Sequence, residues 1–144
     1  MPNYAPAIAP ACIPMQQRFR AHAASVARVR HVITDAAQQG LLGPAADKAE
    51  ITDALCLIAS ELVTNAITHH QGADNLVEVT LWAADGHLWI SVADGGPGQP
   101  VLHRPPDTSA HGRGLLLVAA LAASWGVLPR PGCPGKVVYA AVQL

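Results

Sequence analysis

The segment ELVTNAITH, residues 61–69, places a carboxylate and an amide at helical spacing. Glu61 and Asn65 stand four residues apart, so in a helix their side chains share one face. Helix geometry alone leaves two interpretations open, a ligand site or the solvated edge of an apolar stripe, and the second is the commoner case.

A second segment, DGGPG at residues 94–98, follows an apolar run that is typical of a strand. Its glycines let the backbone approach a ligand closely, and Asp94 at the strand end can accept a hydrogen bond from a ligand amine. An ordinary Asp-Gly turn explains the same residues without any ligand.

The third segment, GRGL at residues 112–115, stands directly before an apolar run. If it opens a helix, the free backbone amides and the helix dipole suit the oxygens of a phosphate group. A tight junction between a loop and a helix also accounts for its two glycines.

Residue patterning places these segments on helices and strands. Apolar residues at helical spacing predict helices at Ser25–Gln39, Lys48–His69 and Leu115–Ala123. Ser25 and Asp47 are candidate N-caps, and Gly40 is expected to end the first helix.

Alternating apolar residues predict a β-hairpin and three further strands. Leu76–Ala84 and His87–Ala93 are joined by Asp85–Gly86, a combination typical of a hairpin. This hairpin places Trp82 and Trp89 across from each other as a pair. The other strands are expected at Gln17–His22, Trp125–Leu128 and Val137–Val142.

The order of these elements predicts an α+β fold in one domain. Helices come first and a meander of strands with one late helix follows. That order predicts a two-layer α/β sandwich, with helices packed on one face of a mostly antiparallel sheet. We expect residues 17–144 to form this domain and the Pro- and Ala-rich residues 1–16 to be a flexible tail.

Composition and charge exclude several classes of protein. Of the 144 residues, 51% are hydrophobic and 13% are charged, and the net charge is −1, which argues against disorder and against nucleic acid as a partner. The low charge is compatible with a homodimer contact. The longest apolar run, 114–123, is too short for a membrane helix of about 20 residues, and Cys12, Cys56 and Cys133 form no CxxC pair. We therefore expect a cytoplasmic protein with reduced thiols and no membrane contact.

Taken together, the three ordered segments resemble the GHKL ATPase superfamily, which shares the Bergerat ATP-binding fold. The closer resemblance is to the small anti-sigma factor and serine-protein-kinase proteins of the RsbW and SpoIIAB type. It extends from about Phe19 to Val142 and is carried by ASELVTNAITH, VADGGPG, GRGLLLVAALAASWGV and GKVVYA.

The resemblance implies a role for each of these residues. By it, Asn65 ligates a Mg²⁺ ion that bridges the phosphates of ATP, and Glu61 is the catalytic carboxylate that orients or deprotonates the attacking hydroxyl. Asp94 accepts a hydrogen bond from the adenine amine. The other ATP-binding residues are the DxGxG glycines and the phosphate segment with its amides: Gly96, Gly98, Gly112, Arg113, Gly114 and Leu115.

Two functions are compatible with the resemblance. In the first, the protein is an ATP- and Mg²⁺-dependent serine/threonine protein kinase of an anti-anti-sigma (STAS-domain) partner, and is itself an anti-sigma factor that binds a sigma factor. In the second, it is a nucleotide-dependent protein-binding switch with little or no kinase activity. Glu61 favours the kinase. Val137, where related sequences often have an adenine-binding threonine, and a short, proline-rich lid favour the switch.

Overall fold

The structure is a computed structural model that describes residues 15–43, 49–69, 75–94, 110–130 and 135–144, with side chains throughout except at 110–115. The described residues form three helices and five strands. In chain order these are β1 (Met15–Arg20), α1 (Ala24–Gln38), α2 (Ala49–His69), β2 (Leu76–Ala84), β3 (His87–Asp94), α3 (Ala110–Leu121), β4 (Ser124–Pro129) and β5 (Lys136–Gln143).

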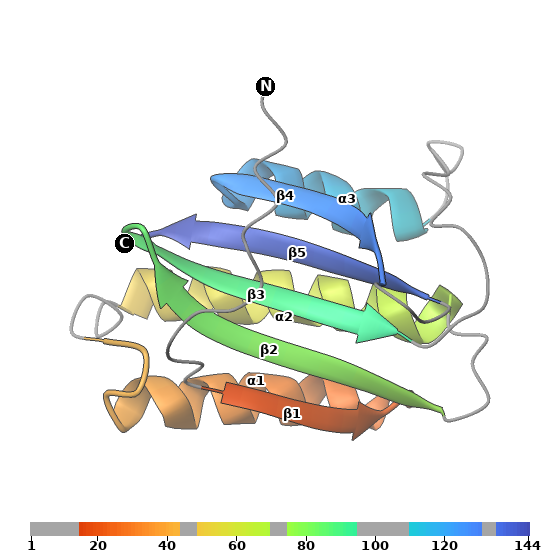
Figure 1. Cartoon of the computed structure of the whole chain (residues 1–144), viewed down its shortest axis with the longest axis horizontal. Helices are drawn as coiled ribbons and strands as arrows, with labels where there is room; N and C mark the ends of the chain where they lie inside the picture. The colour runs from red at the N-terminus through yellow and green to blue at the C-terminus, as the bar shows by residue number, and fades with distance from the viewer. Residues whose placement is uncertain (1–14, 44–48, 70–74, 95–109, 131–134) are drawn as a thin grey trace.

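The strands form one sheet in the order β1-β2-β3-β5-β4, and every neighbouring pair is antiparallel. Figure 1 shows this sheet in front and α1, α2 and α3 behind it, so the helices cover one face. The predicted α+β fold class, a two-layer sandwich on an antiparallel sheet, is confirmed.

The main hydrophobic core lies between the sheet and the helices, and α2 is its central element. Four large apolar residues of α2 recur every three or four positions and are buried: Ile51, Leu55, Ile58 and Leu62. They pack with alternate residues of the strands, among them Val79, Leu81, Leu88 and Ile90. Burying each such side chain contributes roughly 1.5–3 kcal/mol, so tertiary packing holds α2 in place.

Helix α2 is also long and apolar enough, by length and composition, to cross a membrane, a candidate that the sequence analysis did not identify. Its 21 residues include Leu55, Ile58 and Leu62, which are fully buried in the core of the domain. Burial of this stripe accounts for the apolar residues on the core face of the helix, and 33% of the apolar window is buried.

A smaller apolar cluster lies on the opposite face of the sheet. Trp82 and Trp89 are direct partners in the β2–β3 register, and their rings stack with centroids 6.0 Å apart and planes 9° apart. The ring of Tyr139 on β5 lies 6.2 Å from that of Trp89. The predicted pairing of the two tryptophans is confirmed.

The hairpin turn between β2 and β3 forms as predicted. Asp85 and Gly86 both have positive φ, 52° and 72°, as a two-residue turn of type I′ requires. Glycine adopts this conformation at no steric cost, and aspartate tolerates it better than most residues.

The start of α1 differs from the prediction. Ala23 is the N-cap, with no side-chain cap bond, and the hydroxyl of Ser25 instead donates to the carbonyl oxygen of Arg20 at 2.7 Å. The Ala24 amide donates to His22 Nδ1 at 3.1 Å. Ser25 is therefore not the N-cap; it ties the helix to the preceding strand. Asp47, the other predicted cap, lies outside the described residues.

The starts of β1 and α3 also differ from the prediction. Met15 and Gln16 belong to β1, where they pair with Leu81 and Thr80, so the strand begins inside the segment that was predicted to be a tail. Helix α3 begins at Ala110, five residues before the predicted start. A glycine costs only about 1 kcal/mol inside a helix, so the glycines of GRGL do not mark its beginning.

The side chain of Cys56 on α2 packs against α1. Its sulfur is 3.8 Å from the Thr34 hydroxyl oxygen and 3.9 Å from the Arg30 carbonyl oxygen. Burial raises the pKa of the thiol above its ordinary value, an effect that the hydrogen bond with Thr34 opposes. The thiolate is disfavoured, so the contact supports a structural role.

Candidate functional site

Three polar side chains from three elements meet at one end of β3 and β5. Asp94 is the last residue of β3 and Lys136 the first of β5, and the two are direct partners in the register. The Lys136 ammonium donates a hydrogen bond to Asn65 Oδ1 on α2 at 3.3 Å and lies 4.0 Å from Asp94 Oδ2. The structure thus brings the predicted residues Asn65 and Asp94 together.

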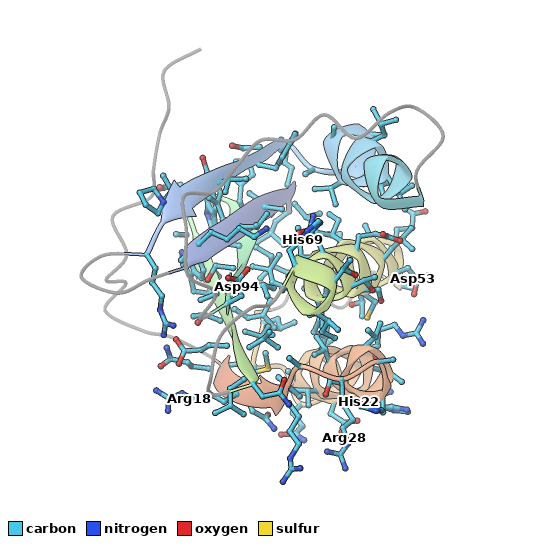
Figure 2. The ribbon with its side chains drawn as sticks, turned by 90° about the vertical axis from the view of Figure 1, so that its right-hand side faces the viewer. Arg18, His22, Arg28, Asp53, His69 and Asp94 are labelled. Carbon is cyan, nitrogen blue, oxygen red and sulfur yellow. The ribbon has the colours of Figure 1, made fainter. Side chains whose placement is uncertain are left out.

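Asp94 belongs to the helix-facing side of the sheet. It continues the alternation of Leu88, Ile90 and Val92, all of which lie in the core between the layers. Figure 2 shows Asp94 on the side of the sheet that faces α2. A ligand held by Asp94 would therefore lie between the two layers, next to the end of α2 that carries Asn65.

The electrostatics of this site are those of a nearly buried ion pair. The side chains of Asp94 and Lys136 are 4% and 18% exposed. A buried carboxylate is costly unless a cation or hydrogen-bond donors offset the loss of water, and Lys136 supplies a cation. Removing Lys136 would therefore affect Asp94 as well as Asn65.

Glu61 lies one helical turn before Asn65 on α2, as the spacing predicts. Its side chain is partly exposed. Within the described ranges no side chain forms a hydrogen bond or ion pair with its carboxylate. The carboxylate is thus free to accept a hydrogen bond from an approaching hydroxyl group.

The phosphate segment lies in the first two turns of α3. Gly112, Arg113, Gly114 and Leu115 all follow the first helical residue, Ala110. Because an α-helix pairs each amide with the carbonyl four residues earlier, the amides of Gly114 and Leu115 fall within the helical pattern, and the free amides are at its start. Gly96 and Gly98, the predicted DxGxG glycines of the ATP site, lie outside the described residues, so their role in ATP binding stays a prediction.

The side chain of Val137 does not face the candidate site, contrary to the role that the sequence analysis gave to this position. It pairs with Ala93, so these two residues belong to the sheet face opposite to Asp94 and Lys136. A threonine hydroxyl at this position would point away from Asp94. The argument that Val137 favours the switch therefore has no support in this arrangement.

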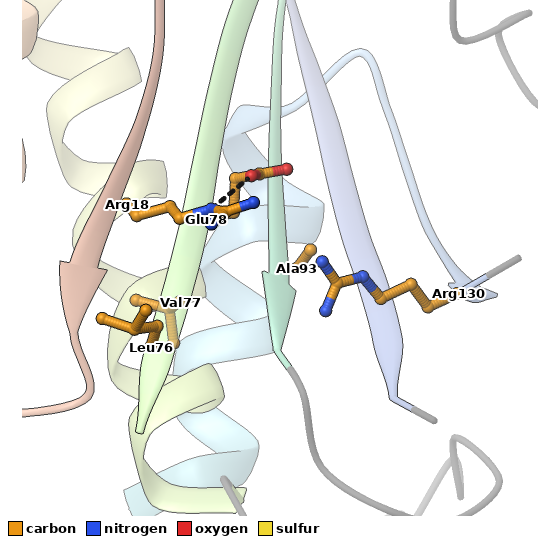
Figure 3. A pocket seen from close by; sticks show the side chains of 6 residues that line it. All are labelled: Arg18, Leu76, Val77, Glu78, Ala93 and Arg130. Atoms are coloured by element: carbon orange, nitrogen blue, oxygen red, sulfur yellow. Dashed lines mark hydrogen bonds and ion pairs between the residues drawn. The ribbon is translucent and has the colours of Figure 1, made fainter. Parts of the chain in front are cut away.

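A hollow lies on that opposite face, and Figure 3 shows its lining residues on β1, β2 and β3 together with Arg130, which follows β4. It is lined by Arg18, Leu76, Val77, Glu78, Ala93 and Arg130. Arg18 Nε and Glu78 Oε2 form an ion pair across it at 3.2 Å. Of the predicted site residues whose side chains the structure describes, Glu61, Asn65 and Asp94 do not line this hollow.

Lys136 is the residue that sequence reasoning missed. GKVVYA supported the family resemblance, but no role was given to its lysine. The only signal in the sequence was a lone cation at the start of a predicted strand. That it faces Asp94 depends on the pairing of β3 with β5, and α3 and β4 separate these strands in the chain.

The residues fit a Mg²⁺ ion that arrives with a nucleotide, but not a metal held by the protein alone. The described residues contain no group of three or more His, Cys, Asp or Glu that could hold a metal. Mg²⁺ commonly takes one protein oxygen and completes its shell with phosphates and water. Because the Lys136 ammonium donates to Asn65 Oδ1, this oxygen faces a position that a cation can occupy.

The layered fold and the position of Asn65 and Asp94 define a nucleotide-binding module of the GHKL type. Comparison with protein families agrees, because the model of the histidine kinase-like ATPase domain matches residues 19–140. The chain belongs to this family. The match spans Glu61, Asn65 and Asp94, and it ends within β5. A search of curated proteins found no match.

Proposed function

We propose that this ATPase-family domain is an anti-sigma factor and a Mg²⁺-dependent serine/threonine kinase that phosphorylates a STAS-domain partner. The observation that carries the proposal is the meeting of Asn65 and Asp94 at one end of the sheet, with Glu61 one turn away on α2. The family match supports ATP as the ligand. Availability of ATP and of sigma factors makes the cytoplasm the expected compartment.

In this proposal each side chain has one task. Asp94 accepts a hydrogen bond from the adenine amine, and Asn65 offers its amide oxygen to Mg²⁺, which neutralises phosphate charge when it is bound. The partner's serine oxygen attacks the γ-phosphorus, its proton passes to the carboxylate of Glu61, and the bond to the leaving ADP oxygen breaks. Glu61 has the free carboxylate that this transfer needs.

A nucleotide-dependent switch is the second candidate, and the backbone of α3 favours it. The amides of Gly114 and Leu115 lie inside the helix, which leaves fewer free donors for phosphate oxygens. ATP would then bind without phosphoryl transfer to another protein, and its binding would change only the contacts between this domain and its partner.

Glu61→Gln separates the two candidates. The amide keeps the size of the side chain but loses basicity, so we expect near-normal ATP affinity and phosphoryl transfer reduced by roughly 10²–10⁴-fold. The measurement is transfer of label from γ-labelled ATP to a STAS protein encoded beside this one, with calorimetry for affinity.

Asp53→Asn is the matched control, because it changes another exposed carboxylate of α2 in the same way. This variant should transfer phosphate like the wild type. Equal transfer by Glu61→Gln and wild type would contradict a catalytic Glu61. Absence of transfer by the wild type to any STAS protein, with ATP binding intact, would favour the switch.

A further inference from the structure

Lys136 occupies the same oxygen that the proposed function assigns to Mg²⁺. Its ammonium donates to Asn65 Oδ1 at 3.3 Å, while the other oxygen-bearing neighbour, Asp94 Oδ2, lies 4.0 Å away. Lys136 is only 18% exposed, so its position is confined by packing as well as by charge.

An amide oxygen is a poor place for two cations at once. Mg²⁺ binds oxygen at about 2.0–2.1 Å, which would bring it within a few ångströms of an ammonium that stays on the same atom. Water screens such repulsion weakly in a partly buried site. Coordination by Asn65 therefore requires the ammonium to leave Asn65 Oδ1.

The Asp94 carboxylate can accept the ammonium when it leaves Asn65. Asp94 has two carboxylate oxygens, and Oδ2 already faces Lys136 at ion-pair distance. Closing that distance places the Lys136 ammonium on Asp94 Oδ2. The residue can therefore release Asn65 without leaving Asp94.

We infer that Lys136 is an internal competitor of Mg²⁺, a positioning residue that holds Asn65 until metal and nucleotide displace it toward Asp94. The inference deepens the proposed function and rests on it. It predicts that the intact protein binds Mg·ATP less tightly than the same site would without its lysine. The lysine is tethered beside Asn65, which gives it a high effective concentration against free metal ions.

The test compares ATP dissociation constants with excess Mg²⁺ and with chelator, in wild type and in Lys136→Met. The ratio of the two constants measures how much the metal tightens ATP. A hydrogen bond to a charged group typically contributes enough to change an equilibrium by about tenfold or more, so we expect this ratio to rise about tenfold in Lys136→Met. Calorimetry gives both constants and requires no activity.

Two further variants serve as controls. Lys136→Arg keeps a cation that can donate to Asn65, so its ratio should stay near that of the wild type. Arg130→Met removes a different cation, which lines the hollow on the opposite face, and should leave the ratio unchanged. If Lys136→Met does not fold, as judged by circular dichroism, Lys136→Gln replaces it with the same expectation, because a neutral amide repels no metal.

The outcomes separate this inference from the proposed function. An unchanged or smaller ratio in the uncharged variants, with ATP still bound by the wild type, overturns the competition and leaves ATP binding intact. Absence of ATP binding by the wild type under both conditions overturns the proposed function, and the inference with it.

Discussion

At the scale of single residues, the site depends on how three side chains share charge and hydrogen bonds. Asp94 is nearly buried, Lys136 lies close enough to form an ion pair with it, and Asn65 Oδ1 accepts a hydrogen bond from the Lys136 ammonium. The three residues are far apart in the sequence, since they come from β3, β5 and α2. A change at one of them should therefore have effects that can be measured at the other two.

Asp94→Asn tests the adenine assignment. The amide removes the anionic acceptor, and a hydrogen bond to a charged group contributes roughly 1.5–3 kcal/mol, so ATP should bind about tenfold more weakly or worse. Calorimetry in the presence of Mg²⁺ measures the change. Asp85→Asn, at the exposed hairpin turn, is the control, and unchanged affinity in a folded Asp94→Asn variant would contradict the assignment.

Asn65→Ala tests the metal assignment. Without the amide oxygen, the tightening of ATP by Mg²⁺ should shrink several-fold, while binding in chelator changes little, because the adenine side of the site is kept. Titrations with and without Mg²⁺ give the two constants. Thr64→Ala serves as the neighbouring control, since its hydroxyl only donates to the Ser60 carbonyl oxygen. A full Mg²⁺ effect in Asn65→Ala would exclude Asn65 as the ligand.

At the scale of elements, the register of β3 against β5 decides what the site contains. Asp94 faces Lys136 because Ala93 faces Val137, and a slip of one residue would exchange the two faces of β5. Burial on both faces opposes such a slip, with Val138 and Ala140 in the main core and Tyr139 in the tryptophan cluster. The packing of Tyr139 thus contributes to the position of Lys136.

Gly126→Ala tests this packing. Gly126 on β4 pairs with Tyr139, and an added Cβ would lie 2.5 Å from the tyrosine hydroxyl oxygen and 2.7 Å from Cζ. The buried ring must shift, so we expect a loss of about 1–3 kcal/mol in the free energy of unfolding, measured in urea.

The effect of the contact with the Tyr139 ring can be isolated by repeating Gly126→Ala in a variant that lacks this ring. In Tyr139→Leu the shorter side chain does not reach the new methyl group, and Gly126→Ala should cost much less there. An equal loss in both backgrounds would show that the ring is not the cause.

At the scale of the whole molecule, the sheet separates two surfaces of different composition. The helices and the Asn65–Asp94 site lie on one side, and the tryptophan cluster and the arginine-lined hollow lie on the other. Ala93 and Asp94 are adjacent in β3 but belong to opposite faces, so the two surfaces are one residue apart in the chain at this point.

Binding of Mg·ATP should stabilise the whole domain. A ligand at 100 times its dissociation constant adds about 2.7 kcal/mol, which for a domain of this size raises the melting temperature by roughly 5–10 °C. Thermal unfolding followed by circular dichroism measures the shift. Asp94→Asn should show a much smaller shift at the same nucleotide concentration, and equal shifts would point to a binding site elsewhere.

Features set by neighbouring residues could be predicted from the sequence. The hairpin at Asp85–Gly86, the shared face of Glu61 and Asn65, and the stripe of α2 depend on interactions within a few positions, so their patterns are local. The fold class followed from the order of such elements, and the motifs pointed to the ATPase family that the family comparison then showed.

Only the tertiary structure decided what faces the site. Lys136 meets Asn65 and Asp94, and Val137 faces away from them, because β5 returns to pair with β3 after α3 and β4 have intervened. Ser25 bonds to Arg20 for a similar reason, since the direction in which the chain enters α1 is set by β1 in the sheet. Burial of whole faces brings together residues that are distant in the chain. Local sequence patterns do not show which residues become partners in this way.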